Sequence, residues 1–304
     1  YYTVCFNNYS DDTVRTNKLK KELEYFHISL SDIKFRYSTS KYGYDIETNT
    51  IYKGMSSIKF IGDNVGDDLY ALRDNKYDSF IDLLIDIKKT SVNSKQLEIL
   101  IKLNFFSEFG EINTLLKQVE YFDLIYGKKQ FNVTKIKQQN LPIEIIETHC
   151  KKQTEKIWKD FDSVELLKDI VSNTEYESTS IKDILSYQNE LYGYIVYTNP
   201  EINKRLYYVS DVRCTKAITI ISVYEIFSGK TREVKMWTSQ YNKNPFSLGN
   251  ILYIISLDKK HKKEPTGEID EVTGKKVYRE VLDKFEYWLG RFIVKDEIEE
   301  GEEL

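Results

Sequence analysis

Two short segments of the chain pass from an apolar run through a glycine bend into a helix-like segment, and such a bend can bind an anion. Gly62 follows residues 58–61, and Gly110 follows residues 105–109. Backbone N–H groups at a helix start have no intrahelical acceptor and lie at the positive end of the helix dipole. Because glycine has no side chain, a phosphate can approach these groups closely. The two bends predict backbone contacts to a polyanion, which carry no sequence information.

Helical periodicity around each bend predicts the elements that position these groups. Apolar residues recur at helical spacing over residues 65–72, after the first bend, and over residues 97–103, before the second. Another helix begins near Asn113. The order of helix, glycine-containing hairpin and helix, repeated within residues 51–125, is typical of a pair of helix-hairpin-helix motifs.

These residues resemble a known family. Residues 51–63 (IYKGMSSIKFIGD) look like the segment of family C bacterial DNA polymerases, the polymerase III α subunit and its phage relatives, that enters a tandem helix-hairpin-helix domain. Residues 96–110 (QLEILIKLNFFSEFG) are similar to the second half of that domain. The chain departs from the family at Phe60, where Gly is frequent, and at Asn104-Phe105, where Gly-Ala is usual; both departures bear on how closely a phosphate can approach. The resemblance implies DNA contacts from Lys59, Ile61, Gly62, Asn64, Phe109 and Gly110.

The resemblance and the changes in pattern along the chain divide it into five segments, and the expected fold class is multidomain α+β. Residues 1–50 are expected to be a connecting segment from the fingers region, with a helix and a short β-hairpin, and residues 51–125 the tandem helix-hairpin-helix DNA-binding domain. Residues 126–185 are expected to be a helical linker, with one helix from about residue 142 to residue 161. Residues 186–295 are expected to form an OB-type barrel, and residues 296–304 an acidic tail that repels DNA.

The predicted barrel rests on five strand-like runs between residues 191 and 255, the first at residues 191–197. Such barrels hold single strands by stacking bases on exposed aromatic rings, for which Tyr207, Tyr208 and Trp237 are candidates. Lys259, Lys260, Lys262 and Lys263 are expected to contact phosphate from a mobile basic loop. Beyond that loop, residues 281–292 are expected to form either a closing amphipathic helix or a sixth strand.

A sliding-clamp contact is a further implication of the resemblance. Members of the family often carry a Gln-x-x-Leu/Met-Phe peptide between the hairpin and OB domains. Residues 138–142 supply Gln138 and Leu141, but Pro142 replaces the aromatic anchor. The alternative is that this segment simply leads into the next helix.

Composition excludes several other classes of protein. The net charge of −4 gives no global basic field, so any nucleic-acid contact depends on local lysines. The three cysteines have no CxxC spacing, which fits a reducing cytoplasm and excludes a zinc ribbon. No apolar run is long enough to form a helix that spans a membrane, so no membrane partner is expected. We assign no catalytic residue, metal or cofactor to this chain: Mg²⁺ would be held by a palm with an Asp-x-Asp pair, which we expect upstream of Tyr1 and not here.

Two functions from different classes are open. The resemblance implies the DNA-binding C-terminal part of a replicative DNA polymerase, which holds primer-template duplex without reading its sequence; single-stranded template and a sliding clamp are further expected partners. The alternative is a stand-alone DNA-binding accessory protein, or a non-catalytic scaffold whose hairpins only pack. Whether the native polypeptide is an enzyme depends on a palm that these residues do not supply.

Overall fold

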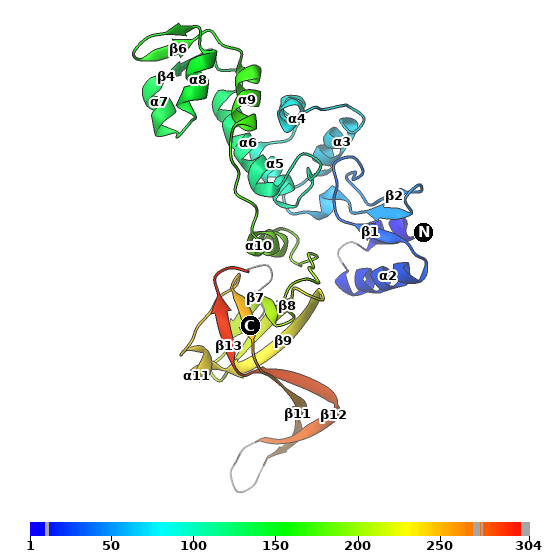
Figure 1. Ribbon diagram of the computed structural model, residues 1–304. Coiled ribbons are helices and arrows are strands. Elements are labelled where there is room, and N and C mark those ends of the chain that lie inside the picture. Colours follow the sequence, from blue (N-terminus) through cyan, green and yellow to red (C-terminus); the bar gives the residue numbers. More distant parts are fainter. Residues whose placement is uncertain (10–11, 270–273, 275, 299–304) are drawn as a thin grey trace. The chain divides into compact units, whose positions relative to one another are not determined.

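A computed structural model describes residues 1–9, 12–269, 274 and 276–298. The chain divides into two compact units, residues 1–179 and residues 180–304 (Figure 1). The first is mainly helical and the second is rich in strands, which agrees with the expected α+β class. None of the helices in the described residues combines the length and the apolar character needed to span a bilayer.

The first unit begins with two helices and a small sheet. Helices α1 (Tyr2–Asn8) and α2 (Thr13–Tyr25) precede strands β1 (Ser29–Ser31), β2 (Gly43–Asp45) and β3 (Thr50–Tyr52). Strand β3 is central, parallel to β1 and antiparallel to β2, and all three of its residues are buried. Phe6, Leu23 and Ile51 join α1, α2 and β3 in one apolar cluster. A helix and a short β-hairpin were expected here, and both are present.

A group of helices follows this sheet, and it includes those expected over residues 65–72, over residues 97–103 and from about Asn113. The helices of this group are the short 3-10 helix η1 (Met55–Ser57), α3 (Asp63–Ala71), α4 (Phe80–Ile87), α5 (Ser94–Lys102) and α6 (Ile112–Ile125). Asn93 and Gln96 form a capping box at the start of α5, since each side chain bonds the backbone N–H of the other residue. An Asn-x-x-Gln sequence thus fixes where α5 begins.

The remainder of the first unit differs from the expected helical linker. It contains β4 (Gln130–Asn132), α7 (Val133–Gln138), α8 (Ile143–His149), β5 (Lys152–Gln153), β6 (Ile157–Lys159) and α9 (Ser163–Ser172). The prediction of one helix over residues 142–161 is wrong, because α8 ends at His149 and β6 pairs with both β4 and β5. Buried Trp158 lies opposite buried Phe131, while Ile157 and Lys159 are exposed. This alternation has the period of a strand.

The second unit begins with helix α10 (Ile181–Leu191), and the strand predicted at residues 191–197 is absent. Ser180 caps α10 by accepting from the N–H of Asp183, and the helix continues to Leu191. The backbone N–H groups of Val196 and Tyr197 both donate to Oε1 of Gln188, which replaces a strand partner. The other predicted strands are present as β7 (Leu206–Cys214), β8 (Ile218–Glu225), β9 (Lys230–Trp237) and β10 (Ile251–Ile254), with the four-residue helix α11 (Thr238–Tyr241) after β9.

Three further strands extend this sheet: β11 (Leu257–Ile269), β12 (Lys276–Leu289) and β13 (Phe292–Lys295). The order of strands is β11-β12-β9-β8-β7-β10-β13, and β11 with β12 forms a ribbon that extends from the rest of the sheet (Figure 1). The prediction of a mobile loop at Lys259, Lys260, Lys262 and Lys263 is wrong. These lysines lie in β11, because residues 257–265 find antiparallel partners in residues 278–289. Of the two alternatives for residues 281–292, a strand is present.

Both faces of the sheet are covered around β7 and β10. Tyr207 belongs to an apolar cluster with residues of β8, β9 and β10, whereas Tyr208 belongs to another that includes Leu185 of α10. Successive residues of a strand point to opposite faces. As a consequence, four consecutive residues of β7, residues 206–209, are buried. Of the expected acidic tail, residues 299–304 lie outside the described residues; Asp296 accepts from Nζ of Lys182 through its carbonyl.

Candidate nucleic-acid interface

The first hairpin brings Lys59, Ile61, Gly62 and Asn64 together at the start of α3. Ile61 is buried and fixes the turn, while the other three residues are exposed. Gly62 is the residue before the helix, and a Cβ added to it would meet no atom within 4 Å. The surface at this helix start is therefore open.

Backbone donors without a partner lie at this open helix start. No side chain caps α3, and among the described residues the N–H groups of Asp63 and Asn64 have no acceptor. A cavity of about 340 Å³ lies here, lined by Gly62, Asp63, Asn64, Val65, Ser91 and Gln96. Its donors suit an anion. The carboxylate of Asp63 lines the same cavity and opposes one.

Neighbouring residues hold α3 in place. Asp68 accepts from the N–H of Ser91 at 2.9 Å and from its hydroxyl at 2.6 Å, and these bonds lower the pKa of the Asp68 carboxyl. On the other side, a Cβ at Gly66 would lie 2.7 Å from Cα of Ser40, so only glycine permits this packing. The cavity is thus bordered by fixed backbone.

The left-handed residue of the first bend is Phe60, not Gly62. Phe60 has φ of 70°, whereas Gly62 has φ of −93°. In the second hairpin the corresponding residue is Asn104, with φ of 60°. These are the two positions where the resemblance led us to expect glycine, so the chain keeps the bends without it. Phe60, Gln96 and Ser91 were not among the predicted site residues; the Asn-x-x-Gln capping pattern was the available signal for Gln96.

The second hairpin differs because its helix start is covered. The N–H of Asn113 donates to Oγ1 of Thr179 at 3.1 Å, and the N–H of Thr179 donates to the carboxylate of Glu111 at 3.2 Å. Phe109 packs against Phe80 and Phe35. The N–H of Asn113 is thus occupied by the chain itself, beside an acidic side chain, which disfavours an anion at this helix start. The phosphate contact at Phe109 and Gly110 stays a prediction.

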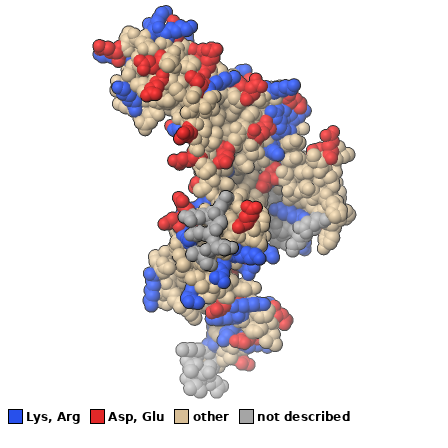
Figure 2. All heavy atoms as spheres, in the orientation of Figure 1, with Lys and Arg blue, Asp and Glu red and all other residues tan. Residues whose placement is uncertain are grey.

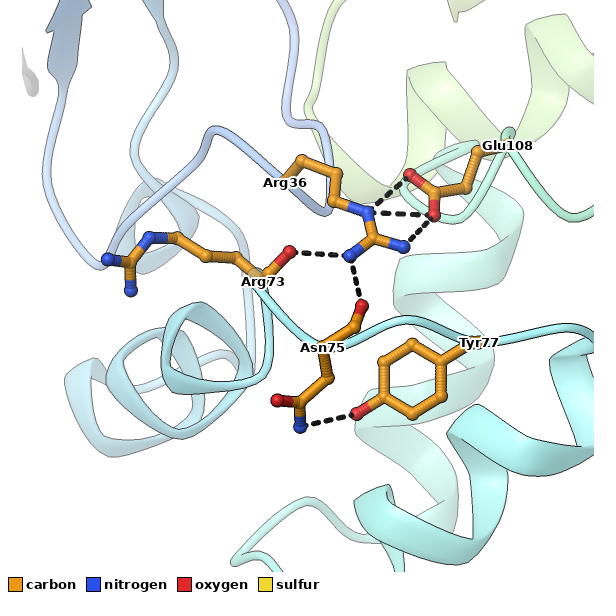
Figure 3. A network of polar contacts seen from close by, with 5 residues as sticks. All are labelled: Arg36, Arg73, Asn75, Tyr77 and Glu108. Carbon is orange, nitrogen blue, oxygen red and sulfur yellow. Dashed lines mark hydrogen bonds and ion pairs between the residues drawn. The ribbon is translucent and has the colours of Figure 1, made fainter.

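Arg36 ties the two hairpins together (Figure 3). Its guanidinium donates to Glu108, with Nη2 2.7 Å from Oε1, and to the carbonyls of Arg73 and Asn75. Glu108 lies in the turn between α5 and α6, whereas Arg73 and Asn75 follow α3. One side chain thus links the segment after α3 to the turn of the second hairpin.

In the second unit, the predicted aromatic residues separate into two groups. Tyr207 and Tyr208 are buried, so the prediction that they stack on bases is wrong. Trp237 is 49% exposed, and its ring lies 4.9 Å from that of Trp288. Nζ of Lys260 lies 4.9 Å from the centre of the Trp288 ring. A cation over the half-buried Trp288 ring, beside the exposed Trp237 ring, is an arrangement that suits nucleic-acid bases.

The four predicted lysines of β11 are exposed but engaged. Lys259 lies 3.8 Å from the centre of the Phe285 ring, Lys262 pairs with Glu264, and Lys263 pairs with Glu280. Figure 2 shows positive and negative side chains interspersed over the visible face. The concentration of positive charge in the sequence is therefore weakened in the fold.

Gln138 and Leu141 do not form an extended peptide. Gln138 is the last residue of α7, and Leu141 is buried, with its N–H donating to the carbonyl of Ile136. Leu141 would have to leave its own core to anchor a clamp. The clamp contact stays a prediction.

An Asp-x-Asp sequence is present at Asp160-Phe161-Asp162, contrary to the expectation that the chain has none. Asp162 caps α9 by accepting from the N–H groups of Val164 and Glu165, and Asp160 pairs with Lys152. Among the described residues, no group of three His, Cys, Asp or Glu side chains could hold a metal ion. These two carboxylates do not fit a polymerase metal centre, since both are engaged in local structure.

Comparison with known proteins gives two matches. A family model for the helix-hairpin-helix motif matches residues 27–114. This range contains both bends. DNA polymerase III subunit alpha of Treponema pallidum (strain Nichols) is 28% identical over 120 residues, which is 39% of this chain and 10% of that protein. The chain thus matches about a tenth of the length of this curated relative.

Proposed function

We propose that this chain, which carries a helix-hairpin-helix motif and is a distant homologue of DNA polymerase III α over 39% of its length, holds duplex DNA for a replicative polymerase. The observation that carries the proposal is the open start of α3 beside Gly62. Two backbone N–H groups there fit one phosphate of a primer-template duplex. Because they contact the backbone alone, the grip is independent of sequence.

The second unit suits an OB-type barrel that binds single-stranded template. Its pairings support this fold: β7 pairs with β8 and β10, β8 with β9, and β9 lies parallel to β12. Only residues 255–256 separate β10 from β11, and residues 290–291 separate β12 from β13. The chain of β10 continues into β11, and that of β12 continues into β13, so that the pairs β10–β13 and β11–β12 form one long hairpin. This hairpin pairs with β7 through β10 and with β9 through β12. Trp237, Trp288 and Lys260 are its proposed contact to single strands.

Nucleotide addition and its Mg²⁺ are proposed to belong to residues outside this chain. The matched relative is named as a polymerase subunit, and only a tenth of it is covered here. The present residues would supply the grip on DNA. A cytoplasmic location and a sliding-clamp partner belong to the same proposal.

A substitution at Gly62 tests the proposal. Its φ of −93° and open surroundings admit any side chain, so Gly62→Glu should fold normally while filling the anion site with negative charge. Wild type should bind labelled primer-template duplex at ~10⁻⁴–10⁻⁶ M, with affinity falling steeply as salt rises. We expect Gly62→Glu to weaken binding about tenfold or more, since charge-assisted hydrogen bonds are lost.

Ser107→Glu is the matched control. It adds the same charge to an exposed position of the second hairpin, whose helix start is covered. Its affinity should equal that of wild type. If wild type does not bind duplex at low salt, the alternative of a scaffold with packed hairpins replaces this proposal.

A further inference from the structure

Phe60 of the first hairpin has a backbone conformation that is unusual for an aromatic residue. Among the described residues, the others with positive φ apart from glycine are His27, Asn49, Asn104, Asn140 and Asp160. Asn, Asp and His tolerate this conformation better than an aromatic residue does. The Phe60 side chain is also 63% exposed, although it is apolar. Its position thus combines a strained backbone with an apolar ring that is largely exposed to water.

Two residues of α5 hold Phe60 in this position. Nε2 of Gln96 donates to the Phe60 carbonyl at 3.1 Å, and Oε1 of the same side chain accepts from the N–H of Asn93. Nζ of Lys95 lies 3.8 Å from the centre of the Phe60 ring. The ring and an exposed ammonium group are therefore presented together.

Phe60 lies close in the chain to the proposed phosphate site and shares one neighbour, Gln96, with it. Phe60 precedes Gly62 by two residues, and Gln96 both lines the cavity and binds the Phe60 carbonyl. In a duplex, the surface next to a phosphate consists of deoxyribose and the edge of the minor groove. Apolar side chains are known to enter that groove, and lysines contact the phosphates that line it.

We propose that Phe60 packs on deoxyribose and base edges in the minor groove of the duplex, while Lys95 contacts a neighbouring phosphate. This inference rests on the proposed function and adds an apolar contact to it. The left-handed backbone at Phe60 directs the ring outward, and Gln96 keeps it there before DNA arrives. The ordering needed for binding is thereby reduced.

Phe60→Gly separates the fold from the contact. Glycine accepts positive φ without strain, so this variant should melt at the same temperature as wild type or higher. Its affinity for blunt duplex should nevertheless fall about tenfold, as expected for loss of an aromatic contact to DNA. Asn104→Gly is the matched control, because it relieves the same strain at the second bend and should leave affinity unchanged. Phe60→Tyr should keep the affinity close to that of wild type.

The salt dependence of binding distinguishes the apolar contact of Phe60 from the phosphate contact of Lys95. Phe60→Gly should lower affinity by the same factor at every salt concentration, because no phosphate contact is lost. Lys95→Gln should reduce the slope of log affinity against log salt by about 0.9. Both effects should be equal on blunt duplex and on primer-template with a single-stranded overhang.

Three results would overturn the inference. Equal or tighter binding by Phe60→Gly would mean that the ring only shields the phosphate site. The proposed function would survive that result if wild type still binds duplex in a salt-dependent way. A loss confined to overhang DNA would place the ring on unpaired bases and not in the groove. Absence of duplex binding by wild type would remove both proposals together.

Discussion

At the scale of single residues, Lys53 shows how burial makes the stability of the first unit depend on pH. Lys53 is 6% exposed, and burial lowers the pKa of its ammonium group from 10.5 to about 8, although nearby Asp32 opposes the shift. Between these two values the unfolded chain binds more protons than the folded chain does. The free energy of unfolding therefore rises with pH in this window.

We expect chemical denaturation of wild type to show a rise of ~2 kcal/mol between pH 8 and pH 10. Above that range the effect reverses, because burial raises the pKa of Tyr42 to about 12 and an unfolded tyrosine ionises earlier. Lys53→Met should remove the rise, since methionine carries no proton to lose. An equal rise in both proteins would assign it to another group.

At the scale of elements, helix α3 has competing demands at its start. The carboxylate of Asp63 interacts favourably with the helix dipole but lines the cavity proposed for phosphate. Asp63→Asn should therefore lower the melting temperature slightly and tighten duplex binding about two- to fivefold. Asp67→Asn, one turn further along the exposed face, is the control and should change affinity less. Weaker binding by Asp63→Asn would contradict the proposed position of the phosphate.

Elements with a long apolar period could be predicted from the sequence, whereas those fixed by distant partners could not. Helices α3, α5 and α6 follow from their buried stripes. Strand β11 is rich in lysine, and its pairing depends on β12 further along the chain. Strands β5 and β6 have two and three residues, too few for their alternation to be recognised from the sequence alone.

The candidate site could likewise be predicted only where it depends on local sequence. The open start at Gly62 follows from local sequence. The closure at Asn113 comes from Thr179, 66 residues away, and no local pattern indicates it. Tyr207 and Tyr208 were candidates because they are aromatic residues of a predicted barrel strand, but a sheet covered on both faces buries adjacent residues.

At the scale of the whole molecule, two units with separate cores should unfold in separate steps. Arg36→Lys loses the bidentate bond to Glu108 and two bonds to backbone carbonyls, so the first unit should lose about 1–3 kcal/mol. Tyr224→Phe removes a buried hydroxyl that donates to the Tyr197 carbonyl, and the second unit should lose about 1 kcal/mol.

Scanning calorimetry should show each variant moving a different transition. Asn75→Ala, which keeps the backbone carbonyl that Arg36 binds, is a control for the first unit. A single transition that both Arg36→Lys and Tyr224→Phe lower would show that the two units unfold together.

The strained backbone at Phe60 and Asn104 has a consequence for directed evolution. A library screened only for survival after heating should collect glycine at both positions, because each replacement removes the same backbone penalty. A library screened for retention on immobilised duplex should accept glycine at position 104 and reject it at position 60. The two screens would thus differ at position 60, where thermal stability favours glycine and DNA binding favours phenylalanine.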